Sequence, residues 1–192
     1  MNALYGLILC GGKSSRLGFP KYSIEKDGFP LYKWWNNTLN AVCDKTYISC
    51  QAMQTKEIDY PLIIKDESTD SGPLEGIYKA FQVNDKVNWL VMACDLVFAD
   101  HKDITALIKN NREGNDAICY LNPETREPFS LFTIYNSQIF PSLVDEYQSE
   151  LKSARRLLMN SNVILLNPED PNILKGINTM EELMSWRQNR LE

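Results

Sequence analysis

Short runs of apolar residues alternate along the chain with segments in which apolar residues recur every three or four positions. The runs are bounded by residues such as glycine, proline, asparagine and aspartate, which end strands and open turns. Continuous apolar runs of this length are typical of strands buried on both faces of a parallel sheet. We expect strands at residues 5–10, 46–50, 62–65, 89–94, 116–121, 129–135 and 163–166.

Helices are expected between most of these strands. Apolar residues from 31 to 42 have helical spacing, and Pro30 suits the first turn of that helix. Asp100 is expected to cap another helix, and Thr179 with Glu182 predicts a capping box for a last helix. The remaining helices are expected at residues 73–83, 136–147 and 153–159.

Alternating strands and helices predict an α/β fold with a mostly parallel central sheet that is covered on both faces. The chain shows no internal repeat and no long linker, so residues 1–192 are expected to form a single domain. In sheets of this kind ligands bind at the carboxyl ends of the strands. Functional side chains should therefore come directly after strands.

Charge and composition narrow the function classes. The net charge of -5 argues against a general nucleic-acid binder, because such proteins carry a basic stripe. A weakly acidic protein that handles a polyanion should concentrate its positive charge at one site. No segment reaches the roughly 18 to 20 consecutive apolar residues that span a bilayer, and the N-terminus lacks the basic start of a signal peptide. We therefore expect a cytoplasmic protein with no membrane partner.

The cysteines are expected to be free thiols in a reducing compartment, because none form a C-x-x-C pair and most lie in apolar segments. A zinc site would need clustered ligands, and the chain has a single histidine. That residue, His101, is expected to have a surface or capping role. The five cysteines are Cys10, Cys43, Cys50, Cys94 and Cys119.

A glycine-rich loop after the first expected strand carries the clearest candidate chemistry. Glycine at positions 11 and 12 lets the backbone turn and approach a ligand closely. Successive backbone N–H groups in such a loop form a concave anion site. Lys13, Arg16 and Lys21 place three positive charges within nine residues of an otherwise acidic chain. The loop therefore predicts a phosphate site, with a polar surface loop as the alternative.

This loop differs from two common phosphate-binding motifs. A Walker A loop reads G-x-x-x-x-G-K-[ST], but the residue five positions before Gly12 is Leu7. A dinucleotide fingerprint reads G-x-G-x-x-G, but Gly11 and Gly12 are adjacent. The loop alone therefore leaves the ligand open.

Two aspartates follow expected strands. Asp66 at a strand end can accept hydrogen bonds from hydroxyl or N–H groups of a ligand, with a solvated carboxylate as the alternative. Asp95 follows an apolar run directly, and a buried carboxylate needs a partner. Mg²⁺ prefers hard oxygen ligands and usually takes one or two carboxylates together with substrate phosphates. A turn or helix-cap role is the alternative for Asp95.

Four segments in this order resemble one family. The loop reads L-x-G-G-x-S-S-R-x-G-x-x-K, which resembles the signature of nucleotidyltransferases with the nucleotide-diphospho-sugar transferase fold. Residues 72–76 resemble their G-P-L-x-G turn, residues 127–132 their E-P-L-x-x-L-Y segment, and residues 178–183 their N-T-P-E-D-L segment. Within these enzymes the chain looks most like the molybdenum cofactor guanylyltransferases.

The resemblance implies a three-layer, Rossmann-like fold and a role for each matching residue. The implied nucleotide-binding residues are Leu9, Cys10, Gly11, Gly12, Ser14, Lys21, Ser49, Asp66, Gly72, Gly76 and Asp95. The implied catalytic residues are Arg16, Lys21 and Asp95, with Asp95 and Asn178 as ligands of Mg²⁺. A helix-cap role is the alternative for Asn178. The implied contacts of the acceptor substrate are Glu127, Pro128, Ser153, Arg155 and Arg156, and a solvated helix face is the alternative for the two arginines.

The implied reaction transfers GMP from GTP to molybdopterin, with release of pyrophosphate and dependence on Mg²⁺. GTP and molybdopterin are the implied partners, together with proteins of molybdenum-cofactor biosynthesis and insertion. One alternative is a sister nucleotidyltransferase that transfers CMP to molybdopterin or acts on a sugar phosphate. Another is a non-catalytic nucleotide-binding domain.

Three positions depart from the family pattern. Val97 stands where the D-x-P motif has proline, and Gly176 stands where an N-x-N motif has its first asparagine. Cys10 replaces the alanine that is usual before the two glycines. These departures put in doubt the turn after Asp95, a second amide contact and the reading of the base.

Overall fold

Seven strands form one sheet in the computed structural model, which describes residues 2–11, 16–67 and 72–190. The strands lie in the order β5-β4-β1-β6-β8-β7-β9, and β8 runs antiparallel to both of its neighbours while the other pairs are parallel. This confirms the expected mostly parallel sheet. The bounds are β1 Leu4–Leu9, β4 Lys45–Gln51, β5 Ile63–Asp66, β6 Asn88–Ala93, β7 Ala117–Leu121, β8 Pro128–Tyr135 and β9 Val163–Leu166.

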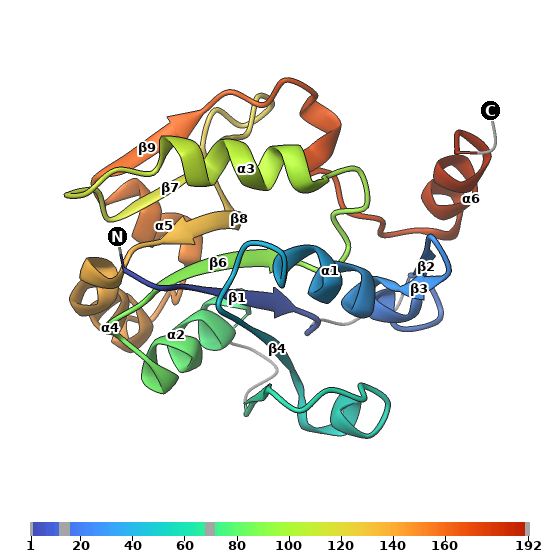
Figure 1. Ribbon diagram of the computed structural model, residues 1–192, viewed down its shortest axis with the longest axis horizontal. Helices are drawn as coiled ribbons and strands as arrows, with labels where there is room; N and C mark the ends of the chain where they lie inside the picture. The colour runs from blue at the N-terminus through green and yellow to red at the C-terminus, as the bar shows by residue number, and fades with distance from the viewer. Residues whose placement is uncertain (1, 12–15, 68–71, 191–192) are drawn as a thin grey trace.

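Helices cover both faces of this sheet (Figure 1). Residues of α1 and α3 belong to the hydrophobic cluster on one face, and residues of α2, α4 and α5 belong to the cluster on the other. The fold therefore has three layers, as expected. The helix bounds are α1 Leu31–Leu39, α2 Pro73–Val83, α3 His101–Asn110, α4 Phe140–Gln148, α5 Ala154–Met159 and α6 Met180–Gln188.

Strand β1 shows why the central strands are apolar throughout. Leu7 and Leu9 point into the cluster that contains α2, whereas Ile8 and Cys10 point into the cluster that contains α1. All four side chains are buried, because successive residues of a strand face opposite sides of the sheet. Full burial of one such aliphatic side chain stabilises the fold by about 1.5–3 kcal/mol.

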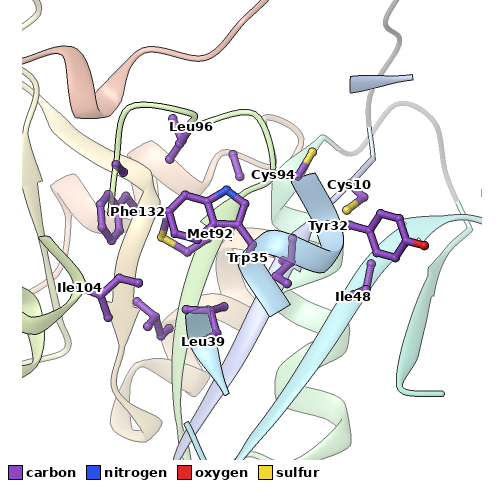
Figure 2. Packing of buried hydrophobic residues seen from close by; sticks show 14 of the residues in the cluster. Cys10, Tyr32, Trp35, Leu39, Ile48, Met92, Cys94, Leu96, Ile104 and Phe132 are labelled. Atoms are coloured by element: carbon purple, nitrogen blue, oxygen red, sulfur yellow. The ribbon is translucent and has the colours of Figure 1, made fainter. Parts of the chain in front are cut away.

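Trp35 anchors the layer formed by α1 and α3. Its side chain is fully buried, and it shares its cluster with Met92 of β6 and Phe132 of β8 (Figure 2). Cys10 and Cys94 lie in the same cluster, just beyond the ends of their strands. The core thus extends to the edge of the sheet at which candidate site residues begin.

A short hairpin and the last helix form a third cluster. Strands β2 Glu25–Lys26 and β3 Phe29–Pro30 pair across a turn in which Asp27 and Gly28 have positive φ angles of 54° and 79°. The buried side chains of Leu183 and Trp186 in α6 belong to this cluster, together with Ile24 and Leu31. The cluster also includes Val97, from the segment that follows β6, so it joins the hairpin to that segment.

Several helix limits differ from the sequence expectation. Helix α1 begins after Pro30, which occupies the capping position, and it ends at Leu39. The expected helix over 136–147 is a 3-10 turn, η3 Ser137–Ile139, followed by α4. The other 3-10 turns, which were not predicted, are η1 Lys21–Ser23, η2 Ala52–Lys56 and η4 Pro171–Leu174.

The expected helix caps are confirmed. Asp100 forms a capping box with Asp103 at α3, and Thr179 forms one with Glu182 at α6. Ser153, which was predicted to contact the acceptor and not to cap a helix, caps α5 by accepting a hydrogen bond from the backbone N–H of Arg156.

The described residues also bear on the cysteines and on membrane-spanning segments. All five cysteines are free, and Cys43 is the only one of them that is not fully buried. Among the described residues no helix is long and apolar enough to cross a membrane.

The two-sided burial of β1 predicts a large loss of stability in Leu7→Ala. Leu7 is completely buried in a central strand, so its truncation should lower the free energy of unfolding by about 2–5 kcal/mol. Leu165 in the edge strand β9 is 44% exposed, and Leu165→Ala is the matched control. Urea denaturation should show a change of about 0.5 kcal/mol or less for the control, and equal losses in both variants would contradict the assignment of β1 to the core.

Candidate active site

The candidate site lies where β1, β4, β5 and β6 end. Asp66 is the last residue of β5, Gly11 comes two residues after β1, and Asp95 comes two residues after β6. Lys21 opens η1, and Asn178 lies just before α6. Because these four strands are parallel and neighbouring, their carboxyl ends form one edge of the sheet.

Lys21 joins two of the predicted residues through its ammonium group. Its Nζ atom donates to Asp95 Oδ2 at 2.6 Å and to Asn178 Oδ1 at 2.7 Å. The Lys21 and Asp95 side chains are 23% and 16% exposed, so this ion pair is shielded from bulk water but still reachable. Three segments that are distant in the sequence therefore meet at one positive charge.

Gly176 provides the space in which Asp95 lies. A Cβ atom built on Gly176 would come within 2.6 Å of Asp95 Oδ2, so any side chain here would displace the carboxylate. The backbone carbonyl of Gly176 accepts a hydrogen bond from Asn178 Nδ2 at 3.0 Å. Gly176, which departs from the N-x-N pattern, thus leaves room for Asp95 and accepts a hydrogen bond from Asn178.

The Asn178 side chain does not cap α6. Thr179 is the capping residue, and its side chain accepts from the backbone N–H of Glu182. Only the backbone N–H of Asn178 takes part, by donating to Glu182 Oε2 at 2.6 Å. The amide oxygen of Asn178 instead faces Lys21.

A second group of predicted residues gathers around Asp66. Ser49 in β4 donates its hydroxyl hydrogen to Asp66 Oδ1 at 2.7 Å. A Cβ atom on Gly11 would come within 2.9 Å of Asp66 Oδ2, and one on Gly76 would come within 2.4 Å of Ser49 Oγ and 2.9 Å of a Leu9 methyl group. The two glycines therefore allow close packing around this carboxylate.

The protonation of Asp66 is shifted by its surroundings. Burial raises the pKa of Asp66, and the hydrogen bond from Ser49 acts in the opposite direction. Glu75, a neighbouring carboxylate, also raises the pKa of Asp66, while Lys79 lowers it. The carboxylate therefore releases its proton at a higher pH than an exposed aspartate.

Glu75 is a residue that the sequence analysis did not assign. Its side chain is buried in the first turn of α2, and its Oε1 accepts from the backbone N–H of Glu67 at 2.6 Å. The same oxygen lies 3.5 Å from Lys79 Nζ. Gly72 caps this helix with a φ of 58°, a conformation that favours glycine. The sequence signal that could have identified Glu75 is its place as an acidic residue in the first turn of a helix.

Cys10 presents only its backbone to the site. Its side chain is buried in the core beside the end of β1 (Figure 2). Burial raises the pKa of the Cys10 thiol. Its carbonyl oxygen accepts a weak hydrogen bond of 3.4 Å from Gln54 Nε2. The replacement of alanine by cysteine therefore changes the core rather than the ligand-facing surface.

The predicted phosphate-binding loop is described only in part. Gly12 and Ser14, like Lys13, lie outside the described residues. Arg16 is described and is exposed to solvent.

The residues predicted to contact an acceptor lie at two distinct places. Glu127 and Pro128 stand at the start of β8, which the antiparallel pairing brings to the edge where β6 ends. Arg155 Nη1 donates to Glu127 Oε2 at 2.7 Å, and the Arg155 side chain is 58% exposed. Arg156 instead donates from Nε to both carboxylate oxygens of Glu146 at 3.0 Å. Arg155 therefore belongs to the site edge, whereas Arg156 ties α5 to α4.

Asp95 Oδ2 and Asn178 Oδ1 both face the ammonium group of Lys21. Carboxylate and amide oxygens of this kind are ligands that suit Mg²⁺. Within residues 2–11, 16–67 and 72–190, no group of three or more histidine, cysteine, aspartate or glutamate side chains is placed to hold a metal ion. A metal bound here would therefore take Asp95 and Asn178 together with oxygens from a substrate. Mg²⁺ sites with few protein ligands and several substrate oxygens are common.

A family model described as the MobA-like NTP transferase domain matches residues 6–164. The chain belongs to this family. It is therefore a nucleotidyltransferase, and the match includes both Asp66 and Asp95. The segment around Asn178 lies beyond the matched residues.

Known relatives agree with the family assignment. A molybdenum cofactor biosynthesis bifunctional protein from Synechocystis sp. is 29% identical over 182 residues, which cover 93% of this chain and 52% of that protein. The chain thus spans about half the length of that relative. A probable molybdenum cofactor guanylyltransferase from Bacillus anthracis is 26% identical over 199 residues, which cover 98% of each chain.

A solved structure shares the fold. The molybdopterin-guanine dinucleotide biosynthesis protein A from Archaeoglobus fulgidus has a TM-score of 0.78 and 19% identity, and the match covers 97% of this chain and 98% of that one. The predicted nucleotidyltransferase fold is thereby confirmed for this MobA-like chain.

The close approach of Gly176 to Asp95 predicts a large effect of Gly176→Ala. The added methyl group must push the Asp95 carboxylate away from Lys21, so pyrophosphate release should slow by about 10- to 100-fold. Lys175→Ala changes an exposed neighbour and is the control. Equal rates in Gly176→Ala and Lys175→Ala would show that the position of Asp95 does not matter.

The raised pKa of Asp66 predicts weaker nucleotide binding in acid. If ionised Asp66 accepts hydrogen bonds from the nucleoside, affinity should be constant above its pKa and fall as pH decreases through it. Ser49→Ala removes a bond that lowers this pKa, so the midpoint should move to higher pH. Nucleotide dissociation constants measured by calorimetry against pH provide the test. Asp66→Asn, which cannot ionise at this position, supplies the reference curve. If Asp66→Asn kept the wild-type dependence of affinity on pH, this role of Asp66 would be contradicted.

Proposed function

We propose that this chain transfers GMP from GTP to the terminal phosphate of molybdopterin, with release of pyrophosphate and with Mg²⁺ as cofactor. The observation that carries the proposal is the meeting of Lys21, Asp95 and Asn178 at one edge of the sheet. The group around Asp66 lies on the neighbouring strands of that edge. A nucleoside triphosphate could then place its nucleoside near Asp66 and its phosphates near Lys21.

The reaction requires no general base. The attacking group is a phosphate oxygen, and a phosphate monoester has a second pKa near 6, so it is mostly dianionic at neutral pH. The main obstacle is repulsion between two polyanions. Positive charge held at the reaction centre lowers that barrier, and such preorganised electrostatic stabilisation is often the largest contribution to catalysis.

Lys21 and the residues around it meet this requirement. Its ammonium group is held in place by Asp95 and Asn178 and is partly exposed, so it can contact a phosphate oxygen. Asp95 and Asn178 would hold Mg²⁺, and the bound ion would supply further positive charge to the triphosphate. Arg16, which is exposed, is expected to add a further positive charge near the phosphates.

The nucleoside end would be held mainly by Asp66 and by backbone groups. The ionised Asp66 carboxylate can accept hydrogen bonds from ribose hydroxyls or from guanine N–H groups, and Ser49 fixes its orientation. The Cys10 side chain points into the core, so only its backbone can contact the base. The choice of guanine follows from the relatives named as guanylyltransferases.

The acceptor would lie toward β8. Glu127 and Arg155 form an exposed ion pair at the same edge of the sheet. Arg155 can exchange its contact with Glu127 for the phosphate of an acceptor, because guanidinium groups bind phosphate in a bidentate manner. Ser153 orients the first turn of α5, from which Arg155 projects.

Asp95→Asn tests the reaction centre. This change keeps the size of the side chain but removes its charge, and the loss of one such stabiliser costs about 2–4 kcal/mol of barrier. We expect turnover to fall by roughly 10²- to 10³-fold, as measured by pyrophosphate release with GTP, Mg²⁺ and molybdopterin. Lys21→Ala should weaken turnover comparably.

The control for charge removal is Asp59→Asn, which changes an exposed aspartate outside the site. Full activity of both Asp95→Asn and Lys21→Ala would contradict the proposed reaction centre. The same assay with CTP, UTP and ATP tests the base, and faster turnover with CTP would indicate a cytidylyltransferase. Nucleotide binding without pyrophosphate release would indicate a non-catalytic domain.

A further inference from the structure

Lys26 is a buried lysine in the β2–β3 hairpin that no step of the reaction uses. It is 8% exposed, and its Nζ atom donates to the carbonyl oxygens of Val97 at 2.8 Å and of Ala99 at 3.2 Å. The same atom lies 3.6 Å from the centre of the Trp34 ring. A buried ammonium is costly unless its hydrogen bonds are satisfied, so the arrangement requires an explanation.

The surroundings of Lys26 make its charged form less favourable than that of an exposed lysine. The pKa of Lys26 is lowered to about 8, mainly by burial and also by the nearby Arg190. Asp27, Asp100 and Asp103 act in the opposite direction. An exposed lysine would avoid the cost of burying its charge. The hairpin could also be held to the core by apolar contacts alone, such as those of the neighbouring Ile24.

Both acceptors of Lys26 lie in the loop that carries Asp95. Within this loop the hydrogen bonds from Leu96 N–H to Ala93 and from Ala99 N–H to Leu96 are both long, at 3.4 Å. A shorter bond of 2.9 Å joins Val97 N–H to the carbonyl oxygen of Asp95. The bonds from Lys26 therefore supply much of the polar anchoring of the segment directly after Asp95.

The segment from Lys21 to Lys26 thus holds the segment from Asp95 to Ala99 at two points. Lys21 binds the Asp95 carboxylate, and Lys26 binds the backbone two and four residues further on. Between them, Ile24 packs in the same cluster as Val97. A rigid connection of this kind fixes where the carboxylate points.

We propose that Lys26 is a positioning residue that holds the loop 95–99 so that the Asp95 carboxylate faces Lys21 and Asn178. This inference rests on the proposed role of Asp95 in the reaction. Lys26 is not placed to contact a substrate, because its side chain is buried and its ammonium group donates to two backbone carbonyls.

The test is a double-mutant cycle between Lys26→Met and Asp95→Asn. Methionine retains most of the apolar stem and removes the ammonium, so Lys26→Met should lower kcat about tenfold or more and leave KM for the nucleotide within about twofold. In the Asp95→Asn background, Lys26→Met should cause little further loss, because effects that act through one residue are not additive. Losses that add, or a raised KM with unchanged kcat, would overturn the proposal.

Hydrogen exchange provides a readout that does not depend on activity. The peptide covering residues 94–100 should take up deuterium faster in Lys26→Met than in the wild type, because two backbone anchors are lost. Lys33→Met, which changes an exposed lysine in α1, should leave exchange and kcat unchanged. Unchanged exchange in Lys26→Met would also overturn the proposal.

Folding of the variants is checked by circular dichroism and thermal denaturation. If Lys26→Met does not fold, the cycle is repeated with Lys26→Gln, whose shorter amide keeps a polar group but cannot reach both carbonyls. Failure of both variants to fold would mean that Lys26 serves the fold and not the position of Asp95. Full activity of Asp95→Asn would instead refute the proposed reaction centre, while the exchange measurement would still report on the loop.

Discussion

The arrangement of the site depends on two hydrogen bonds that the ammonium group of Lys21 donates. This group brings together Asp95 and Asn178, which lie 74 and 157 positions away in the sequence. Without a cation, the negative Asp95 carboxylate and the partly negative Asn178 amide oxygen would repel one another in a partly buried place, where repulsion is poorly screened. The segment at η1, the segment after β6 and the segment before α6 are therefore joined by one charge, and the apolar cluster that contains Ile24, Val97 and Ile177 also joins these parts of the chain.

Small residues are the second requirement of this edge of the sheet. Gly176 leaves room for Asp95, Gly11 leaves room for Asp66, and Gly76 leaves room for Ser49. At each of these positions a Cβ atom would meet the polar side chain at less than 3.0 Å. The polar groups therefore pack directly against the backbone at these three positions. Close packing of this kind restricts the orientations that Asp95, Asp66 and Ser49 can take.

Much of this structure follows from the sequence, because the strongest signals are local. The apolar runs located all seven strands of the sheet, and the capping residues Thr179 and Asp100 located two helices. Asp66 and Asp95 could be assigned to one edge, since both follow parallel strands. These signals need only the periodicity and hydrogen-bonding capacity of short segments.

Other features were not predictable, because they depend on contacts between distant segments. The two-residue strands of the hairpin are too short to show a period. Lys26 and Glu75 look like surface residues in the sequence, and only the folded chain shows that both are buried and hydrogen-bonded. Arg155 and Arg156 are adjacent, but they pair with carboxylates on different elements. Val97 replaces a proline, and the loop that contains it is held instead by a side chain from elsewhere.

The reversed direction of β8 has a consequence for how this architecture can diversify. The parallel strands β1, β4, β5 and β6 each reach the site once and leave it through a helix or a long connection. Strands β7 and β8 are instead joined by a tight turn at Asn122–Arg126, with Arg126 N–H bonded to the Asn122 carbonyl at 2.8 Å. A turn of this kind can be lengthened or exchanged without moving the strands that bear Asp66 and Asp95. The scaffold thus separates the strands that bear Asp66 and Asp95 from a turn that can change independently of them.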